Sequence, residues 1–346
     1  MLQKILNKYG ISQKAEPFGT GLINHTWLVN EGPEPFILQR INHNVFKSPA
    51  DIASNIRLIA KYLAENARDY LFVTPERTLG EEDLVHVPGE GYFRLFPFIK
   101  GSHTIDVVNS PSQAYEAAVQ FGRFTRLLAD FPVEQLRITL PDFHNLPLRY
   151  HQFEEAIMYG NKERIKEASS TIHALQQHRE IVAISESIPG NPEFKKRVTH
   201  HDTKISNVLF DENEKGLCVI DLDTVMPGYF ISDVGDMIRT YLSPVSEEEK
   251  DFTRIEIRDE YFKAIAQGYL SEMKDELTAT EKKHFVYGGK FMIYMQALRF
   301  LSDYLNNDVY YGSRYEGQNF VRANNQLVLL QLLIEKEDHL VGLITP

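Results

Sequence analysis

The chain has 346 residues, of which 43% are hydrophobic and 25% charged, as expected for a globular protein with a sizeable core. Its 37 basic and 48 acidic residues give a net charge of −11 without a basic block, so nucleic-acid binding is not expected. The single cysteine excludes an intrachain disulfide, and the sequence shows neither a signal-peptide pattern nor an apolar run of roughly 18 residues, so we expect a cytoplasmic protein that does not enter a membrane.

Residues 1–99 are predicted to be rich in strands. The apolar runs TWLVN and PFILQRIN flank the break EGPEP, which is typical of a hairpin. A helix is expected to begin at Ser48, because a cap residue and a first-turn proline precede isoleucines at helical spacing. DLVHV and GYFRLFPFI then form a second candidate hairpin across residues 88–91.

Residues 100–346 are predicted to be mainly helical. The sequence favours a helix at 110–131, helices over 150–185, 246–275 and 280–305, and a final amphipathic helix over 319–337. We therefore expect an N-terminal nucleotide-binding lobe, 1–99, and a helical catalytic and substrate lobe, 100–346. A cleft between two unlike lobes is a natural ligand site.

One segment interrupts the helices, VTHHDTKISNVLFDENEKGLCVIDLDTV at 198–225. NVLF and LCVI are strand-like runs joined by the charged turn DENEKG, so a hairpin would bring Asp202 and Asn207 close to Asp221 and Asp223. Carboxylate and amide oxygens suit Mg²⁺, whereas two adjacent histidines and one strand cysteine do not suit zinc.

The spacing Asp-x-x-x-x-Asn, followed by an aspartate after the next strand, is typical of phosphoryl transfer. The first aspartate orients the attacking hydroxyl and accepts its proton, while the asparagine and the later aspartate hold Mg²⁺ on the nucleotide. Here those residues are Asp202, Asn207 and Asp221. Each one taken alone is more often a turn-capping residue, but the three together favour the chemical role.

HHDTKISNVLF followed by VIDLD resembles the catalytic and metal motifs of the aminoglycoside phosphotransferase and choline kinase superfamily. FGTGLINHTWLV, FRLFPFIKGS, TLPDFHNLPLRY and LRFLSDYLNNDVYY are further similar to the N-acetylhexosamine kinases, which phosphorylate the anomeric hydroxyl of GlcNAc or GalNAc. The resemblance implies an α+β, protein-kinase-like two-lobe fold, with a small antiparallel-sheet N-lobe and a larger helical C-lobe. It also implies ATP and Mg²⁺ as cofactors, and a sugar or another small alcohol as acceptor.

The resemblance assigns catalysis to Asp202 and Mg²⁺ binding to Asn207 and Asp221. Asp223 shares a face with Asp221 in an extended segment, so it could touch a second metal ion or the substrate, or be an ordinary turn residue. The matched motif also assigns loop-supporting roles, which fall on His200, Lys204 and Asp233. His201 stands where the family usually has glycine. Lys204 could instead approach the transferred phosphate or be a solvated side chain.

The expected phosphate loop, FGTGLINHT, offers Gly19, Thr20 and Gly21 to the nucleotide, although Asn24 replaces a third glycine and an ordinary hairpin turn is the alternative.

The next strand should supply a cation to the phosphates but contains no lysine. Gln39 and Arg40 point to opposite faces; Arg40 is favoured for its bidentate guanidinium, with a surface arginine as the alternative. No acidic residue lies centrally in the following helix, so a lysine–glutamate pair is not evident.

Two further sites follow from the resemblance. Adenine would meet the backbone at the lobe junction, at Pro97, Phe98 and Ile99, unless these only pack in the core. The acceptor would be bound by the helical lobe, with Arg299 and Asp303 as candidates. These two residues lie one turn apart, so an i,i+4 ion pair is the alternative. Asn24 and His25, on the phosphate loop, are additional candidates for sugar contacts.

The leading hypothesis is therefore an ATP- and Mg²⁺-dependent N-acetylhexosamine kinase. A kinase for choline, homoserine or an aminoglycoside is the second, and a nucleotide-binding pseudokinase, suggested only by the missing strand lysine, is the third. A protein kinase is disfavoured, because a dozen residues between Asp221 and Asp233 leave little room for a peptide platform. Neither the nucleotide preference nor the oligomeric state follows from the sequence.

Overall fold

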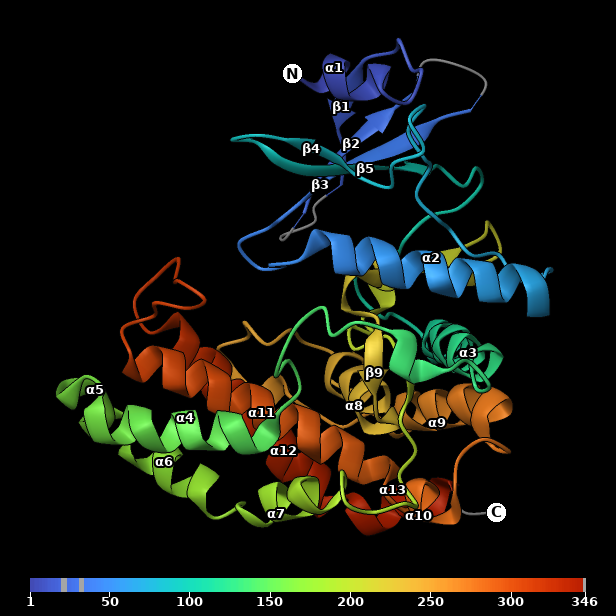
Figure 1. The fold of residues 1–346 in the computed structure, drawn as a ribbon. Helices are drawn as coiled ribbons and strands as arrows, with labels where there is room; N and C mark the ends of the chain where they lie inside the picture. The colour runs from blue at the N-terminus through green and yellow to red at the C-terminus, as the bar shows by residue number, and fades with distance from the viewer. Residues whose placement is uncertain (20–23, 31–33, 345–346) are drawn as a thin grey trace.

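The structure, a computed structural model, describes residues 1–19, 24–30 and 34–344. A small sheet and a larger helical part lie on opposite sides of one long helix, α2 (Figure 1). This is the α+β arrangement expected from the sequence. The boundary at residue 99 stays a prediction, although the last strand of the sheet ends close to it, at Pro97.

The N-terminal sheet has five antiparallel strands in the order β1-β2-β3-β5-β4. These strands are β1 (Ala15–Pro17), β2 (His25–Val29), β3 (Phe36–Ile41), β4 (Val85–Val87) and β5 (Gly91–Pro97). Both predicted hairpins are confirmed, β2–β3 and β4–β5. One face carries a small core in which Leu38, Phe93 and Leu95 pack with α1 (Leu2–Asn7). Because side chains alternate along a strand, Gln39 and Arg94 lie on the opposite face.

α2 (Pro49–Asn66) begins after Ser48, as predicted. Its buried residues Ile52, Ile56, Ile59 and Leu63 belong to the large core of the helical part and not to the small core of the sheet. Asn55 is fully buried and donates to the carbonyls of Arg137 and Val225 at 2.8 and 3.0 Å. α2 is therefore tied to the helical part by both packing and hydrogen bonds.

The helical part is built around α11 (Phe285–Leu305), which packs against α4, α8 and α12 (Figure 1). Gly235 of α8 faces the carbonyl of Gly288 so closely that a Cβ would clash with it. The other helices are α3 (Pro111–Leu127), α4 (Leu146–Tyr159), α5 (Lys162–Glu167), α6 (Ser169–Gln176), α7 (Glu180–Ser187), α8 (Phe230–Tyr241), α9 (Asp259–Met273), α10 (Ala279–Lys283), α12 (Gln318–Glu335) and α13 (Glu337–Ile344).

Two short antiparallel ribbons interrupt these helices. The predicted hairpin is confirmed as β7 (Val208–Phe210) and β8 (Gly216–Val219). A second ribbon, which the sequence analysis did not predict, pairs β6 (Arg197–Thr199) with β9 (Met226–Gly228). Single 3₁₀ turns complete the chain: η1 (Val133–Gln135), η2 (Ile205–Asn207), η3 (Leu222–Thr224) and η4 (Phe252–Arg254). The two ribbons hold the segments that carry the candidate active site.

The helix predicted over 246–275 was wrong in its first half, because α9 begins only at Asp259. Ser246 accepts a hydrogen bond from the amide of Glu248, and Asp251 accepts one from that of Thr253. Such local side-chain bonds offer the backbone an alternative to the helix. Among the described residues, none of the helices has the length and apolar character needed to cross a bilayer.

Candidate active site

The loop between β6 and η2 is braced by two buried carboxylates of α8, Asp233 and Asp236, of which Asp236 accepts from the backbone amide of Thr203 at 2.9 Å. Asp233, on α8, accepts hydrogen bonds from the backbone amides of His200 and His201 at 3.1 and 2.7 Å. The hydroxyl of Thr203 donates to the backbone carbonyl of Asp233 at 2.7 Å. These contacts support the bracing role expected for Asp233, since they fix the backbone on both sides of Asp202.

His200 connects this loop to the end of β8. Its Nε2 lies 2.9 Å from the carbonyl oxygen of Ile220, which can only accept, so Nε2 carries the proton. Nδ1 is then an acceptor for the amide of Asp202, at 3.4 Å. Burial lowers the pKa of His200, which is consistent with this neutral ring. His200 thereby holds the loop against the segment that carries Asp221.

His201 has a positive φ of 66°, in the left-handed region that glycine favours. This conformation explains why glycine is common at the corresponding position of the resembling family. Here the histidine ring is buried and packs so closely on Gly228 that a Cβ there would clash with it. Burial lowers the pKa of His201 to about 4, so the ring is neutral at physiological pH.

The structure brings Asp202 and Asn207 together. The amide nitrogen of Asn207 donates to the backbone carbonyl and to the carboxylate of Asp202, at 2.9 and 3.0 Å. This orientation points the amide oxygen, the atom that could bind a metal, away from that carboxylate. Lys204 lies 3.2 Å from the same carboxylate. The Asp202 side chain keeps 21% exposure, which leaves room for an incoming hydroxyl.

Asp221 follows β8 after one intervening residue, Ile220; it has a positive φ of 58°, and its side chain is exposed. Although one side is open to solvent, the protein around it and the carboxylates of Asp223 and Asp202 raise its pKa to about 7. A divalent cation would offset this crowding of negative charge.

No group of three His, Cys, Asp or Glu residues within the described ranges could hold a metal unaided. Asn207 and Asp221 nevertheless fit Mg²⁺, which usually takes one or two protein oxygens and completes its shell with water and phosphates.

Asp223, the third expected metal ligand, is placed differently. Its side chain is 1% exposed, one oxygen lies 2.5 Å from Nη1 of Arg94, and the other accepts from the amide of Asn24 at 2.9 Å. Both oxygens are therefore engaged by the N-terminal sheet and the segment before β2. These contacts favour a structural role for Asp223 over metal binding.

The residues that were expected to contact the nucleotide lie in different parts of the N-terminal sheet and its loops. Arg40 lies 3.8 Å from Glu90 of the β4–β5 turn, on the face opposite to Gln39. Gly19 has a positive φ of 78°, which suits a tight loop, whereas Thr20 and Gly21 lie outside the described residues. His25 is exposed at the start of β2.

At the lobe junction, the amide of Phe98 already donates to the carbonyl of Pro35, at 3.0 Å. The carbonyl of Ile99 accepts from Ser102. Pro97, which has no amide hydrogen, ends β5. The predicted adenine contacts therefore depend on the remaining backbone groups. The ring of Phe18 meets that of Phe98 edge-on, with centroids 6.3 Å apart, which brings the start of the phosphate loop beside this junction.

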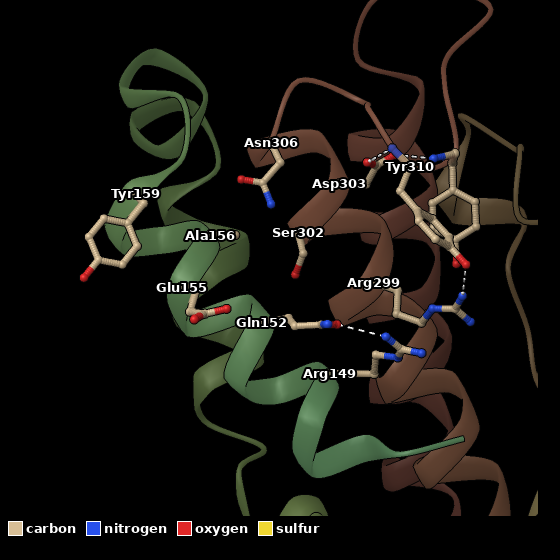
Figure 2. Close-up of a pocket in the computed structure, with 11 residues that line it drawn as sticks. Arg149, Gln152, Glu155, Ala156, Tyr159, Arg299, Ser302, Asp303, Asn306 and Tyr310 are labelled. Atoms are coloured by element: carbon tan, nitrogen blue, oxygen red, sulfur yellow. Dashed lines mark hydrogen bonds between the residues drawn. The ribbon is translucent and has the colours of Figure 1, made fainter. Parts of the chain in front are cut away.

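A pocket of about 520 Å³ lies between α4 and α11, with Arg149 and Arg299 in its wall (Figure 2). Nη1 of Arg299 donates to Gln296 at 3.0 Å, so the alternative ion pair with Asp303 is not formed. Instead, Asp303 accepts from the amides of Tyr310 and Tyr311 at 2.7 and 2.9 Å, which fixes the loop above the pocket. Arg299 therefore lines the pocket and forms no ion pair with a carboxylate among the residues that the structure describes.

Arg149 was not predicted from the sequence. It donates to Gln152 and to the carbonyl of Asp142, while its Nε is buried and makes no hydrogen bond among the described residues. The ring of His144, which precedes α4, lies 5.3 Å from that of His201, so the segment leading into α4 contacts the braced loop. A lone arginine in a helical segment gives no sequence signal that would have identified it.

Several solved structures share this fold. The microcompartment-associated aminopropanol kinase aligns with a TM-score of 0.68 at 17% identity, over 99% of both chains. A spectinomycin phosphotransferase in complex with ADP and spectinomycin gives 0.63 at 14%, over 97% of both chains. A choline kinase from Cryptosporidium parvum gives 0.56 at 16%, over 96% of this chain and 91% of that one. At these identities the likeness shows the fold alone.

The family is shown by the sequence itself. Residues 14–279 match the phosphotransferase enzyme family, a range that includes the sheet, the braced loop and both ribbons. The enzyme class and the superfamily expected from the sequence are therefore confirmed, and the chain belongs to the phosphotransferase enzyme family.

Proposed function

We propose that this phosphotransferase is an ATP- and Mg²⁺-dependent kinase that phosphorylates the anomeric hydroxyl of an N-acetylhexosamine, such as GlcNAc or GalNAc. The observation that carries the phosphoryl-transfer part is the contact between Asn207 and the partly exposed carboxylate of Asp202, close to Asp221. In this arrangement a proton acceptor lies beside two oxygen ligands that suit Mg²⁺.

In the proposed reaction, Asp202 orients the acceptor hydroxyl and takes its proton as the oxygen bonds to the γ-phosphorus of ATP. The bond from that phosphorus to the β,γ-bridging oxygen breaks, and ADP leaves. Asn207 keeps the carboxylate in place, and Lys204 partly balances its charge. Bound Mg²⁺ would supply positive charge to the phosphate oxygens. Asn207 and Asp221 are the residues that would hold it.

The pocket beside α11 supports a polar acceptor with many oxygen atoms. Arg149 and Arg299 line it, and the hydrogen bonds of both go to neutral groups, although Glu155 and Asp303 also belong to the lining. Sugar hydroxyls and an acetamido carbonyl can accept the N–H groups of the two arginines. Tyr310 adds an aromatic ring at the rim, which suits the apolar face of a sugar (Figure 2).

A kinase for another small alcohol is the second candidate. Its support is the fold shared with kinases named for aminopropanol, choline and spectinomycin. Aminopropanol and choline carry a positive charge at neutral pH, and the pocket would place that charge beside two arginines as well as beside Glu155 and Asp303. The pseudokinase alternative has less support, since Asp202, Asn207 and Asp221 are all present near one another.

The test is a panel of acceptors with Mg-ATP. GlcNAc, GalNAc, choline, homoserine and an aminoglycoside are incubated separately with the full chain, and phosphorylated products are identified by mass and by ³¹P NMR. We expect a hexosamine 1-phosphate, and no product from the Asp202→Asn variant. Phosphorylation of choline, homoserine or the aminoglycoside alone would refute the sugar assignment but retain the kinase. The absence of any product, with ATP still bound, would favour the pseudokinase.

A further inference from the structure

The face of the sheet opposite its small core has a buried arginine where the sequence offered no lysine. β3 carries Gln39 on this face, and the antiparallel register places Arg94 of β5 directly opposite. Nε and Nη2 of Arg94 both donate to the side-chain oxygen of Gln39, at 3.2 and 2.9 Å. Gln39 therefore fixes the guanidinium of Arg94 from the neighbouring strand.

The other end of the Arg94 guanidinium contacts a residue of the helical part. Nη1 of Arg94 lies 2.5 Å from the carboxylate of Asp223, and the side chains are only 2% and 1% exposed. Asn24 donates to the second oxygen of that carboxylate, while its own oxygen accepts from the amide of Asn42. The start of β2, the sheet and the turn after Asp221 are thus joined through one desolvated ion pair.

We propose that Arg94 and Asp223 take the place of the kinase lysine–glutamate pair, with Arg94 as the positioning cation for the nucleotide phosphates and Asp223 as its carboxylate anchor. This inference rests on the proposed function, because it assumes that a nucleotide binds in the cleft. The residues come from different elements than in the usual pair. The cation lies on β5 instead of β3, and the carboxylate lies in η3 instead of the helix that follows β3.

Two properties of the pair support this role. An arginine has five N–H donors. Toward the described part of the chain, Arg94 uses the three donors named above, which leaves two, one on each terminal nitrogen. Because the site around Arg94 is desolvated, the charge of Arg94 is screened less than the charge of Arg40, which lies in an exposed contact with Glu90. Asp223, with both oxygens bonded, acts through Arg94 and not as a metal ligand.

The test is the binding of adenosine, ADP and Mg-ADP to the full chain, measured by calorimetry. The readout is the phosphate preference, the ratio of the adenosine Kd to the ADP Kd. Arg94→Met should reduce this ratio about tenfold or more, because Asp223 then faces the phosphates unpaired. Asp223→Asn should keep or increase the ratio, because Arg94 loses its counter-charge. Arg94→Lys, which keeps the charge, should retain most of the preference.

A fall of the ratio in Arg94→Met, without a fall in Asp223→Asn, is the signature of the proposal. If the Arg94–Asp223 pair were purely structural, the substitutions would weaken adenosine and ADP binding in parallel and leave the ratio unchanged. That result would overturn the proposal. Loss of the Mg²⁺ effect in Asp223→Asn would instead make Asp223 a metal ligand. If Arg40→Met lost the phosphate preference while Arg94→Met kept it, the phosphate-binding cation would be Arg40, and the proposal would also be overturned.

Controls cover misfolding and failure of the proposed function. Arg77→Met removes an exposed N-terminal arginine that pairs with Glu81, and it should behave as wild type. If Arg94→Met does not fold, the double variant Arg94→Met/Asp223→Asn avoids an unpaired buried charge, and its ratio should still fall below wild type. A wild-type chain that binds neither adenosine nor ADP would refute the proposed function itself, whereas unchanged preference in the folded variants refutes only the role of Arg94.

Discussion

Asn207 holds Asp202 by two hydrogen bonds from a single amide nitrogen, one to the backbone carbonyl and one to the carboxylate. The contact closes the loop between the two residues. In addition, the backbone amide of Asn207 donates to the carbonyl of Lys204 at 2.9 Å. One side of Asn207 therefore orients the proposed base, and the other is left for a metal ion. The two roles expected of this residue are geometrically compatible.

We predict that Asp202→Asn reduces kcat by about 10²- to 10⁴-fold, because proton acceptance and orientation of the hydroxyl are lost. The substitution keeps the size of the side chain, so the affinity for Mg-ADP should change by no more than about threefold. Single-turnover transfer and ADP calorimetry measure the two effects. Near wild-type turnover in a variant that binds ADP would assign the base elsewhere.

The site could be predicted from sequence where its parts are local. Asp202 and Asn207 lie in one short loop, and the alternating apolar runs on both sides fix the hairpin that brings Asp221 near them. The bracing aspartate, Asp233, follows in the next helix. In such a segment, the order of residues along the chain nearly determines their arrangement in space.

The rest of the site depends on which segments distant in the sequence pair with one another in the fold. Arg94 and Asp223 are 129 positions apart, and nothing in either local sequence indicates their contact. Strand alternation did show that Gln39 and Arg40 face opposite sides, but not which face was the cleft. The choice of Arg40 followed from side-chain chemistry alone. Only the pairing of β3 with β5 shows that Gln39 shares its face with Arg94.

The buried ring of His201 predicts a specific acid sensitivity. Burial lowers its folded pKa to about 4, from 6.5 in the unfolded chain, so the unfolded chain binds a proton more readily between these values. Stability that is present above pH 6.5 is therefore lost as the pH falls toward 4. For this one group the free energy of unfolding should be about 2 kcal/mol lower at pH 5 than at pH 7.5.

His201→Asn tests this origin, because asparagine tolerates the left-handed backbone but does not titrate. Urea unfolding at both pH values should show that the stability difference between wild type and variant shrinks as the pH falls. His173→Asn, on an exposed position of α6, controls for the loss of a histidine. A difference that stays constant with pH would mean that His201 is already charged or exposed in the native protein.

The proposed acceptor pocket gives a third prediction, on substrate binding. Arg299→Met should raise the KM for the sugar about 10- to 100-fold, because charge-assisted hydrogen bonds to the acceptor are lost. The KM for Mg-ATP should not change, since the pocket lies between α4 and α11 (Figure 2). Arg126→Met, which removes an arginine paired with Glu272 on α9, is the matched control. An unchanged KM for every active acceptor would place the acceptor site elsewhere.

The buried ion pair between Arg197 and Glu281 gives the last prediction, which concerns stability. Glu281 is completely buried, and its carboxylate contacts Nη1 and Nη2 of Arg197 at 2.6 and 2.9 Å, at the start of β6. Glu281→Gln leaves the Arg197 charge without a counter-ion, so the free energy of unfolding should fall by about 3–5 kcal/mol. The measurement is urea unfolding at pH 7.5. The double variant Arg197→Met/Glu281→Leu removes both charges and should recover much of the loss, because the cost comes from the unpaired arginine. Equal losses in the single and double variants would show instead that the hydrogen bonds that Glu281 accepts from the backbone amides of Lys195 and Thr278 account for its contribution.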